Sequence, residues 1–329
     1  MGIRSAAFLG VFLLSCQIGV WAVQAQPMVL GYSGSGISTD LRRVIETQRL
    51  WEKYGLNMKS VYFISGSVLS RAIAAGEVLV SDSDVPAVLN LAVSGLAELK
   101  VIAVTINRLE HFFVVRKAIM KPEDLREKRV AVSGIGSASD ITTRMVLRFW
   151  KLNPEKELSI LASGNTPTRI AALTVGHVDA GLVSPDHVNR VLATGCCRIF
   201  ADLAELPLDY ARFGVTVPTR MVRTQRQTAL NLLKAYIEAV QIFKTRPEVV
   251  SSVLREEGIT DPKVVKEIYD RLSKSLREYP APEPMGVQSA LDSLPSPKAR
   301  TAKAEDFMDT SLMEEIQKSG FIDRLYGRR

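Results

Sequence analysis

Cysteine and histidine are both scarce in this sequence, with three of each among 329 residues. Cys16 lies near the N-terminus, and Cys196 and Cys197 are adjacent, so the disulfide framework of a small secreted domain is excluded. The histidines are well separated along the chain: His111, His177 and His187. This spacing supports neither a metal site nor a histidine-based catalytic triad, and we expect no cofactor.

The adjacent cysteines come just before the apolar residues Ile199 and Phe200. Neighbouring cysteines rarely form a disulfide without strain, and two thiols make a poor metal site on their own. We therefore interpret Cys196 and Cys197 as packing residues of a strand, with a vicinal disulfide as the alternative.

Basic patches and low-complexity tracts are also missing. The net charge of +7 is modest, and Lys and Arg are interleaved with Asp and Glu along the chain. No basic run with interleaved aromatic residues occurs, so solvated surface charge is favoured over a nucleic-acid partner. The length exceeds what one hydrophobic core usually supports, which predicts two domains.

One apolar run stands at the N-terminus. Arg4 precedes the apolar residues 6–14, which are too few to span a membrane comfortably, and Val23-Gln24-Ala25 has the small-residue pattern of a cleavage site. Residues 1–25 are therefore predicted to be a signal peptide. Leu13-Leu14-Ser15-Cys16 also resembles a lipoprotein box, so the alternative is a lipid anchor at Cys16. Either way the protein is expected in the periplasm or exported, without crossing the membrane.

Strand and helix signals alternate after this segment. The first half has apolar strand runs at 28–30, 61–64, 78–80 and 100–105, separated by helical patterns. The pattern restarts with strands near 129–132, 158–161, 178–183 and 198–200. Such alternation predicts parallel strands joined by right-handed crossovers, in two α/β lobes. A return strand is expected at 213–217, and the helices after it should pack on the first lobe.

Several segments in order resemble one family of transport proteins. The segments are Leu50 to Leu56, Ala72 to Val78, Gly95 with Lys100 to Ala103, Pro122 to Val132 and Ala171 to Ala180. Together they resemble the solute-binding proteins of nitrate/sulfonate/taurine-type ABC importers, the SsuA-like family. Pro122 to Val132 is similar to that family's "DLKGKKVAV" segment, and Ala171 to Ala180 to its "AL..G.VDA" signature.

The resemblance implies a type II periplasmic-binding-protein fold, with two lobes, two hinge strands and a ligand in the cleft between them. Lobe one would comprise residues 26–116, lobe two residues 117–206, and residues 207–329 the return hinge and the helices that complete lobe one. The hinges would lie near Val114–Lys117 and Leu206–Phe213. The implied partners are a small-molecule ligand and an ABC permease in the inner membrane, and the protein would be a monomer.

In open α/β sheets, ligands bind beyond the carboxyl ends of the strands, and this rule selects the candidate ligand-binding residues. The candidates are hydroxyl-bearing side chains: Ser33, Ser35, Ser38, Ser81, Ser83 and Thr105 in lobe one, and Ser133, Ser137, Ser139, Thr166 and Ser184 in lobe two. Each hydroxyl has a structural alternative. Ser137, for example, stands three residues before Asp140 and could cap the helix that begins there.

Two glycine loops belong to these strand ends, Gly34-Ser35-Gly36 and Gly134-Ile135-Gly136. Both lack the third glycine of a dinucleotide-binding fingerprint, which argues against a nucleotide cofactor.

Charged residues near the expected cleft give a mixed indication. Arg108 and Arg169 would suit a carboxylate or sulfonate, although solvation at the surface is the favoured interpretation. Leu79 stands where the family often has an aspartate, and Asp82 and Asp84 follow it. Acidic groups at the cleft would disfavour a simple anion unless they are turned away from it.

The sequence thus predicts an extracytoplasmic protein that binds a small polar organic molecule, delivers it to a permease and catalyses no reaction. A pyrimidine-synthase-like enzyme on the same fold is one alternative, because Cys196 and Cys197 weakly resemble the cysteine cluster of such enzymes. A ligand-sensing protein for a membrane receptor is the other.

Overall fold

The computed structural model describes residues 26–33, 37–109, 111–206 and 209–328. The predicted signal peptide and Cys16 lie outside the described residues. None of the helices described is long and apolar enough to cross a membrane.

The first lobe is built on a five-stranded sheet in the order β2-β1-β3-β10-β4. All neighbours in it are parallel except β10, which runs antiparallel to β3 and β4. Its strands are β1 Met28–Ser33, β2 Met58–Phe63, β3 Val80–Asp84, β4 Leu99–Ile106 and β10 Phe213–Pro218. Its connecting helices are α1 Ile37–Thr47, α2 Leu50–Lys53, α3 Gly66–Ala74 and α4 Val85–Val93.

The second lobe repeats this plan with the order β7-β6-β8-β5-β9, in which β5 is the antiparallel strand. Its strands are β5 Phe112–Arg116, β6 Arg129–Val132, β7 Ser159–Ala162, β8 Ala180–Val183 and β9 Cys197–Asp202. Its helices are η1 Pro122–Leu125, α5 Ala138–Phe149, α6 Thr166–Thr174, η2 Pro185–His187, α7 Val188–Ala193 and η3 Leu203–Glu205.

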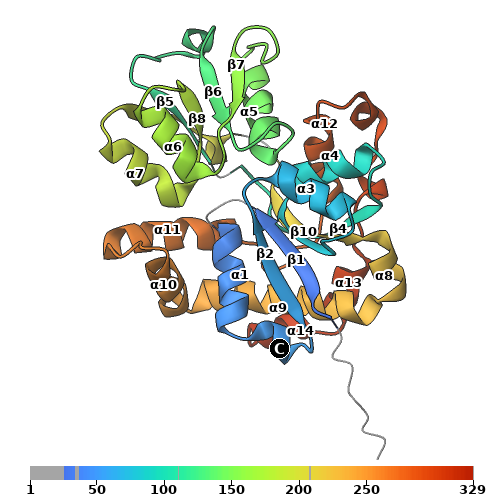
Figure 1. Cartoon of the computed structure of the whole chain (residues 1–329). Coiled ribbons are helices and arrows are strands. Elements are labelled where there is room, and N and C mark those ends of the chain that lie inside the picture. Colours follow the sequence, from blue (N-terminus) through green and yellow to red (C-terminus); the bar gives the residue numbers. More distant parts are fainter. Residues whose placement is uncertain (1–25, 34–36, 110, 207–208, 329) are drawn as a thin grey trace, which may run out of the picture.

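The chain after β10 is helical and completes the first lobe. The elements are α8 Thr219–Thr224, α9 Arg226–Thr245, α10 Pro247–Glu256, α11 Pro262–Ser275, α12 Pro284–Asp292, η4 Pro297–Thr301, η5 Ala304–Asp306, α13 Ser311–Lys318 and α14 Phe321–Leu325. The apolar stripe of α9 packs with α1, α10 and α13 against one face of the first sheet. Helices α3 and α4 cover the other face (Figure 1). The predicted two-lobed α/β fold with added C-terminal helices is confirmed.

The chain crosses between the two lobes twice. β4 ends at Ile106 and β5 begins at Phe112, so the first crossing lies at 107–111. It therefore precedes the predicted hinge Val114–Lys117, of which residues 114–116 belong to β5 within the second sheet. The return crossing lies between η3 and β10, within the predicted segment Leu206–Phe213.

Local capping explains why helices begin where the strands end. Ser65, Ser137 and Asn165 stand before α3, α5 and α6, and each side chain accepts a hydrogen bond from a backbone amide in the first turn. Such caps satisfy amides that the helix itself leaves unpaired. They place polar loops at the edges of the two sheets that face each other.

The strand β3 differs from the prediction. Residues 81–84 were expected to follow the strand, but they lie within it, because they pair with β10 on one side and partly with β1 on the other. Alternate side chains of β3 therefore point to opposite faces of the sheet. This orientation decides what Asp82 can contact.

Both cysteines of the second lobe are free. Cys197 begins β9 and packs in the lobe-two core with Val114 and Val183, whereas Cys196 is half-buried. Cys197 pairs with Arg116, and the opposite ends of these strands pair Asp202 with Phe112 at the crossing. The thiols therefore lie at the end of lobe two that is remote from lobe one.

Candidate functional site

The lobes contact each other along the loops at their facing strand ends (Figure 1). Gly134 lies so close to lobe one that an added Cβ would be 2.7 Å from the Ser67 hydroxyl. The Asn165 amide donates to the Tyr62 hydroxyl across the gap at 3.5 Å. The cleft between the lobes is therefore narrow, with side chains of both lobes lining it.

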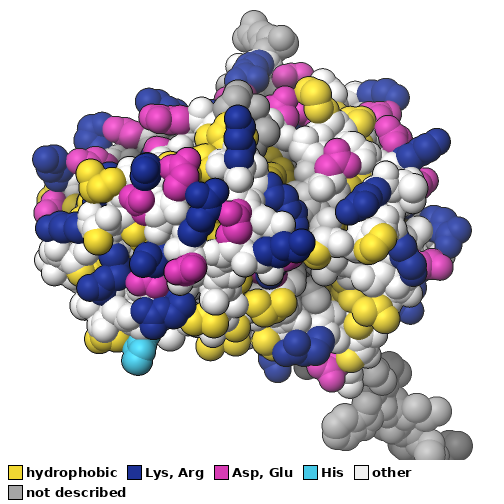
Figure 2. Space-filling model, turned by 90° about the horizontal axis from the view of Figure 1, so that it is seen from above, with side chains coloured by type: hydrophobic (Ala, Val, Ile, Leu, Met, Phe, Trp, Pro, Cys, Tyr) yellow, Lys and Arg dark blue, Asp and Glu magenta, His cyan; other side chains and the backbone are white. Residues whose placement is uncertain are grey.

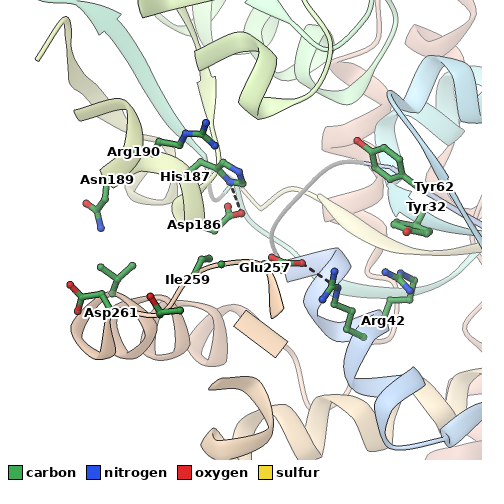
Figure 3. A pocket seen from close by; sticks show the side chains of 14 residues that line it. Tyr32, Arg42, Tyr62, Asp186, His187, Asn189, Arg190, Glu257, Ile259 and Asp261 are labelled. Carbon is green, nitrogen blue, oxygen red and sulfur yellow. Dashed lines mark ion pairs between the residues drawn. The ribbon is translucent and has the colours of Figure 1, made fainter. Parts of the chain in front are cut away.

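A cavity of about 580 Å³ opens within this cleft. Figure 3 shows the lobe-two residues Asp186, His187, Asn189 and Arg190 above Glu257, Ile259 and Asp261 of lobe one, with Tyr32 and Tyr62 to the right. Lobe one contributes Tyr32, Arg42, Arg43, Tyr62, Glu257, Gly258, Ile259, Thr260, Asp261 and Val264, and lobe two contributes Asp186, His187, Asn189 and Arg190. This volume suits a small organic molecule.

Tyr32 and Tyr62 form an aromatic wall from neighbouring strands. Their ring centroids are 5.5 Å apart, and the Arg42 guanidinium lies 4.0 Å over the Tyr32 ring. Arg42 also pairs with Glu46 one turn along α1. Tyr62 keeps 43% of its surface exposed. Tyr62 is therefore free to contact a ligand, while Tyr32 is held by Arg42.

Ionic groups from the two lobes face each other across the cavity (Figure 3). In lobe two, His187 Nδ1 lies 2.6 Å from Asp186 Oδ2, and in lobe one Arg43 Nε lies 3.3 Å from Glu257 Oε1. Burial opposes ionisation of both Asp186 and His187, but their pairing prevails, lowering the Asp186 pKa and raising the His187 pKa. The Glu257 pKa is raised by burial and by the charge of Asp186. The two lobes are thus coupled electrostatically.

Arg169, on the first turn of α6, is only 3% exposed. It donates to the Leu182 carbonyl at 3.2 Å, the Gly164 carbonyl at 2.8 Å and the Thr166 hydroxyl at 3.0 Å. No carboxylate pairs with it within the described part of the chain, and burial lowers its pKa to about 10. The interpretation of Arg169 as a solvated surface residue was therefore wrong, whereas Arg108 is exposed as that interpretation requires.

The charge of Arg169 acts on the cleft. It lowers the pKa of His111 in the first crossing segment and is itself influenced by Tyr62 of lobe one. Burial is the larger cause for His111, whose pKa falls to about 4, so the imidazole is neutral near pH 7. Arg169 is thus a buried cation within electrostatic range of His111 in the first crossing and of Tyr62 in the aromatic wall.

The second crossing segment supplies another buried guanidinium, Arg212. It pairs with Asp84 at the end of β3, and its Nη2 lies 3.4 Å from the His111 ring nitrogens. Asp84 is therefore neutralised by its partner.

Asp82 is turned away from the loops that follow the sheet. It lies on the face of β3 covered by α9, pairs in register with Tyr32, and is 1% exposed. Burial raises its pKa to about 7, an effect that Tyr236 and Arg42 partly offset. Asp82 and Asp84 therefore do not disfavour an anionic ligand, because Asp84 is paired with Arg212 and Asp82 is buried in the core.

Comparison with known proteins places the chain in a family. A sequence profile of the NMT1-like family matches residues 24–255, more than half of the chain. The chain belongs to the NMT1-like family. It is also 27% identical over 219 residues to the taurine-binding periplasmic protein of Escherichia coli strain K12. That match covers 60% of this chain and 63% of the relative, so the chain spans less than two thirds of the relative's length.

Solved structures confirm the fold of this NMT1-like protein. A protein from Bordetella bronchiseptica RB50 superposes with a TM-score of 0.79 at 17% identity, over 92% of this chain and 98% of that one. The alkanesulfonate-binding protein SsuA from Xanthomonas axonopodis pv. citri, bound to MOPS, has a TM-score of 0.68 at 17% identity, over 81% and 90%. The nitrate-binding protein NrtA from Synechocystis PCC 6803 has a TM-score of 0.71 at 13% identity, over 90% and 89%. These structures confirm the predicted periplasmic-binding-protein fold, and the family match with the Escherichia coli relative confirms the SsuA-like resemblance.

The four hydroxyl residues predicted for lobe one whose side chains are described are all buried in this NMT1-like protein, and their contact with a ligand stays a prediction. Ser35 lies outside the described residues, and only the backbone of Ser38 is described. Ser81 and Ser83 are buried in β3 and bond to each other at 2.7 Å. Thr105 is buried and donates to the Phe213 carbonyl at 3.4 Å. Ser33 ends β1, and its buried hydroxyl has no hydrogen-bond partner among the described residues.

The hydroxyl residues predicted for lobe two are brought together more closely. Ser133, Ser137 and Ser139 form a triangle with oxygen separations of 2.9 to 3.0 Å, and Ser137 also caps α5. Thr166 accepts from Arg169, and Ser184 lies 3.4 Å from His187 Nδ1. The structure thus places these serines and Thr166 among the polar contacts of lobe two, and their contact with a ligand stays a prediction.

Several lining residues of this NMT1-like protein escaped the sequence reasoning. Tyr62 was assigned to a strand, Tyr32 followed one, Glu257 fell in the helical region after the return strand, and His187 was dismissed because the histidines are isolated in sequence. The rule about strand ends could have found Tyr62, which stands at the end of β2. No sequence signal could have brought Glu257 to the cleft, since α10 reaches it only through tertiary packing. Among the described residues, no three His, Cys, Asp or Glu side chains group in a way that could hold a metal ion.

Proposed function

We propose that this chain is an extracytoplasmic solute-binding protein that encloses a small organic anion, a sulfonate or a carboxylate, and delivers it to an ABC permease. Residues 1–25 serve as the export signal, and the protein acts as a monomer. Family membership and relatives described as taurine-, alkanesulfonate- and nitrate-binding proteins support this proposal.

The observation that carries the proposal is the buried guanidinium of Arg169. Transferring a charge into the protein interior without a counter-ion is costly. Arg169 uses three of its five N–H groups on neutral oxygens, which leaves two donors and the whole positive charge uncompensated among the described residues. A bound carboxylate or sulfonate supplies the missing charge and accepts the remaining hydrogen bonds.

Most acidic groups in and near the cavity have a cationic partner, since Asp186 pairs with His187 and Glu257 with Arg43. Asp84 is paired with Arg212, and Asp82 faces the lobe-one core. Arg190 lines the cavity with no carboxylate paired to it within the described ranges. On the face of the molecule seen in Figure 2, by contrast, Lys and Arg mingle with Asp and Glu.

The distribution of these residues over two lobes explains how binding leads to closure. Arg169 and His187 belong to lobe two, whereas Tyr62 and Arg43 belong to lobe one. A ligand touches both sets only when the lobes are together, so its binding free energy favours the closed form. A permease can then distinguish loaded from empty protein by shape.

A thermal-shift screen of sulfonates, carboxylates, amines, pyrimidines and aromatic acids tests the ligand class. A ligand at a hundred times its dissociation constant adds about 2.7 kcal/mol to the free energy of unfolding. We expect the stabilising compounds to be anions, and small-angle scattering should show compaction with them. Stabilisation by amines alone would refute the proposal.

The Arg169→Gln variant then tests whether Arg169 binds the anion. Its affinity is measured by isothermal titration with the anion that stabilises the unmodified protein most in the thermal-shift screen. Losing a charge-assisted hydrogen bond costs about 1.5–3 kcal/mol, which corresponds to a 10- to 150-fold weaker affinity. Arg198→Gln is the matched control, because Arg198 also lies in lobe two and also donates to a carbonyl, that of Ile119. Equal affinities of the two variants would exclude Arg169 as the anion-binding residue.

A further inference from the structure

A second cavity, of about 510 Å³, lies on the other side of the η2–α7 segment from the first. The two cavities share only Asn189 among their lining residues. The second cavity is lined from the first crossing by Arg108, from lobe two by Phe112, Pro185, Val188, Asn189 and Ala204, and from α11 by Glu267, Ile268, Asp270, Arg271, Lys274 and Ser275.

This cavity has an apolar floor and a positively charged rim. Phe112, Val188 and Ile268 are apolar, and Ile268 is 4% exposed. Arg108 and Lys274 are exposed cations without a hydrogen-bond or ion-pair partner within the described ranges. An apolar floor beneath unpaired cations is suited to a molecule with an apolar body and an acidic group.

The acidic residues of the lining compensate these cations only in part. Asp270 is engaged by Lys266 on the outer side of α11, at 2.5 Å. Arg271 is a third cation, and it is paired with Asp202 through two contacts of 2.7 and 2.9 Å. Glu267 is thus the one carboxylate of the lining left to balance Arg108 and Lys274 among the described residues.

The walls of the cavity belong to both lobes, and Arg271 connects them. It stands on α11 of lobe one, pairs with Asp202 of β9 in lobe two, and lies 4.4 Å over the ring of Phe112 at the start of β5. Opening of the lobes would separate α11 from β9 and take the cavity apart. A ligand held there therefore favours the closed arrangement, as a ligand in the first cavity does.

We propose that this second cavity is a separate binding site for an amphipathic organic anion, whose apolar body packs on Phe112 and Ile268 and whose acidic group meets Arg108 and Lys274. Occupation of this site holds the lobes together and so raises the affinity of the first cavity for its own ligand. By reciprocity, the ligand of the first cavity raises the affinity of the second.

Isothermal titration of the purified protein with 2-naphthoate, and with the uncharged 2-naphthalenemethanol, tests the chemistry of this site. The acid should bind more tightly than the alcohol. Lys274→Ala and Arg108→Ala should each weaken 2-naphthoate binding about 2- to 5-fold, the range of exposed ion pairs. Lys263→Ala is the matched control, because it removes an exposed lysine of the same helix that does not line the cavity.

The Arg169→Gln variant distinguishes the two sites. If the second site exists, 2-naphthoate still binds to this variant and stays sensitive to Lys274→Ala. Loss of all 2-naphthoate binding with Arg169→Gln would overturn the second site, because the probe would then occupy the first cavity alone. Equal weakening by Lys263→Ala and Lys274→Ala would also overturn it, since that indicates unspecific attraction. Neither of these two outcomes changes the result of the thermal-shift screen, so the proposed function of the first cavity can hold even if the second site does not exist.

Discussion

Asp82 offers a sharp test of the core beneath the aromatic wall. Its carboxylate is buried in β3, and neither oxygen has a hydrogen-bond partner among the described residues. The Tyr236 hydroxyl of α9 faces this carboxylate and lowers its pKa, but by less than burial raises it. Asp82→Asn replaces the ionisable group with a neutral one of nearly the same shape, so it should remove the cost of ionisation while preserving the packing.

The magnitude follows from the two pKa values of Asp82. The folded protein holds this carboxyl at a pKa of about 7, against an ordinary value of 3.8. At about 1.36 kcal/mol for each pKa unit, the difference corresponds to roughly 4 kcal/mol. The favourable contribution is fully present below pH 3.8, where both states are protonated. It falls as pH rises, because only the folded state keeps the proton, and it is lost above about pH 7.

Urea unfolding at pH 5, 6, 7 and 8 measures this contribution. The free energy of unfolding of the unmodified protein should fall more steeply across this range than that of Asp82→Asn. The variant should be the more stable of the two at pH 8, by up to about 4 kcal/mol. Asp306→Asn, at an exposed position of the same lobe, is the control and should follow the unmodified protein.

Two results would refute the reasoning about Asp82. Parallel pH profiles for the unmodified protein and Asp82→Asn would show that the carboxyl titrates alike in the folded and unfolded states. A large loss of stability in Asp82→Asn at pH 8 would show that the ionised carboxylate is satisfied by partners in the core.

Three further changes test the packing around the cleft by urea unfolding. Arg212→Met should cost about 3–5 kcal/mol because it leaves Asp84 unpaired, and Asp84→Asn in the same chain should restore most of the loss; additive losses would contradict the pairing. Gly214→Ala should cost about 3 kcal/mol or more, since its Cβ would lie 2.1 Å from the Ala103 carbonyl oxygen, whereas Gly55→Ala meets no atom within 4 Å and should cost only about 1–2 kcal/mol; similar costs would argue against the clash. Ser137→Ala should cost about 1 kcal/mol through the lost cap of α5, and an accompanying loss of anion affinity would show that the hydroxyl also meets the ligand.

Much of the fold was predictable because its signals are local. Apolar runs such as 100–105 become strands, and caps such as Ser137 start helices, whatever the rest of the chain does. The return strand β10 was recognisable because Phe213 to Val217 is an isolated apolar run before a long helical region. The end of β3 was mispredicted, because Ser81 to Asp84 is polar and becomes a strand only by pairing with β10, more than 100 residues later.

The candidate site was less predictable because its side chains depend on distant partners. Arg169 reads as an ordinary surface arginine of an amphipathic helix, and it is buried only because Leu182 and Gly164 enclose its guanidinium. Asp82 and Asp84 look alike in sequence, yet the burial of Asp82 beneath α9 and the pairing of Asp84 with Arg212 separate their roles.

The sequence by itself determined the two α/β lobes and the family, and it predicted the strand ends at which a ligand would bind, since each depends on residues close together in the chain. Only the tertiary structure decided which charges face the cleft and which are cancelled. Those outcomes depend on burial and on ion pairs between the two lobes and their crossing segments, and no local pattern of residues records them.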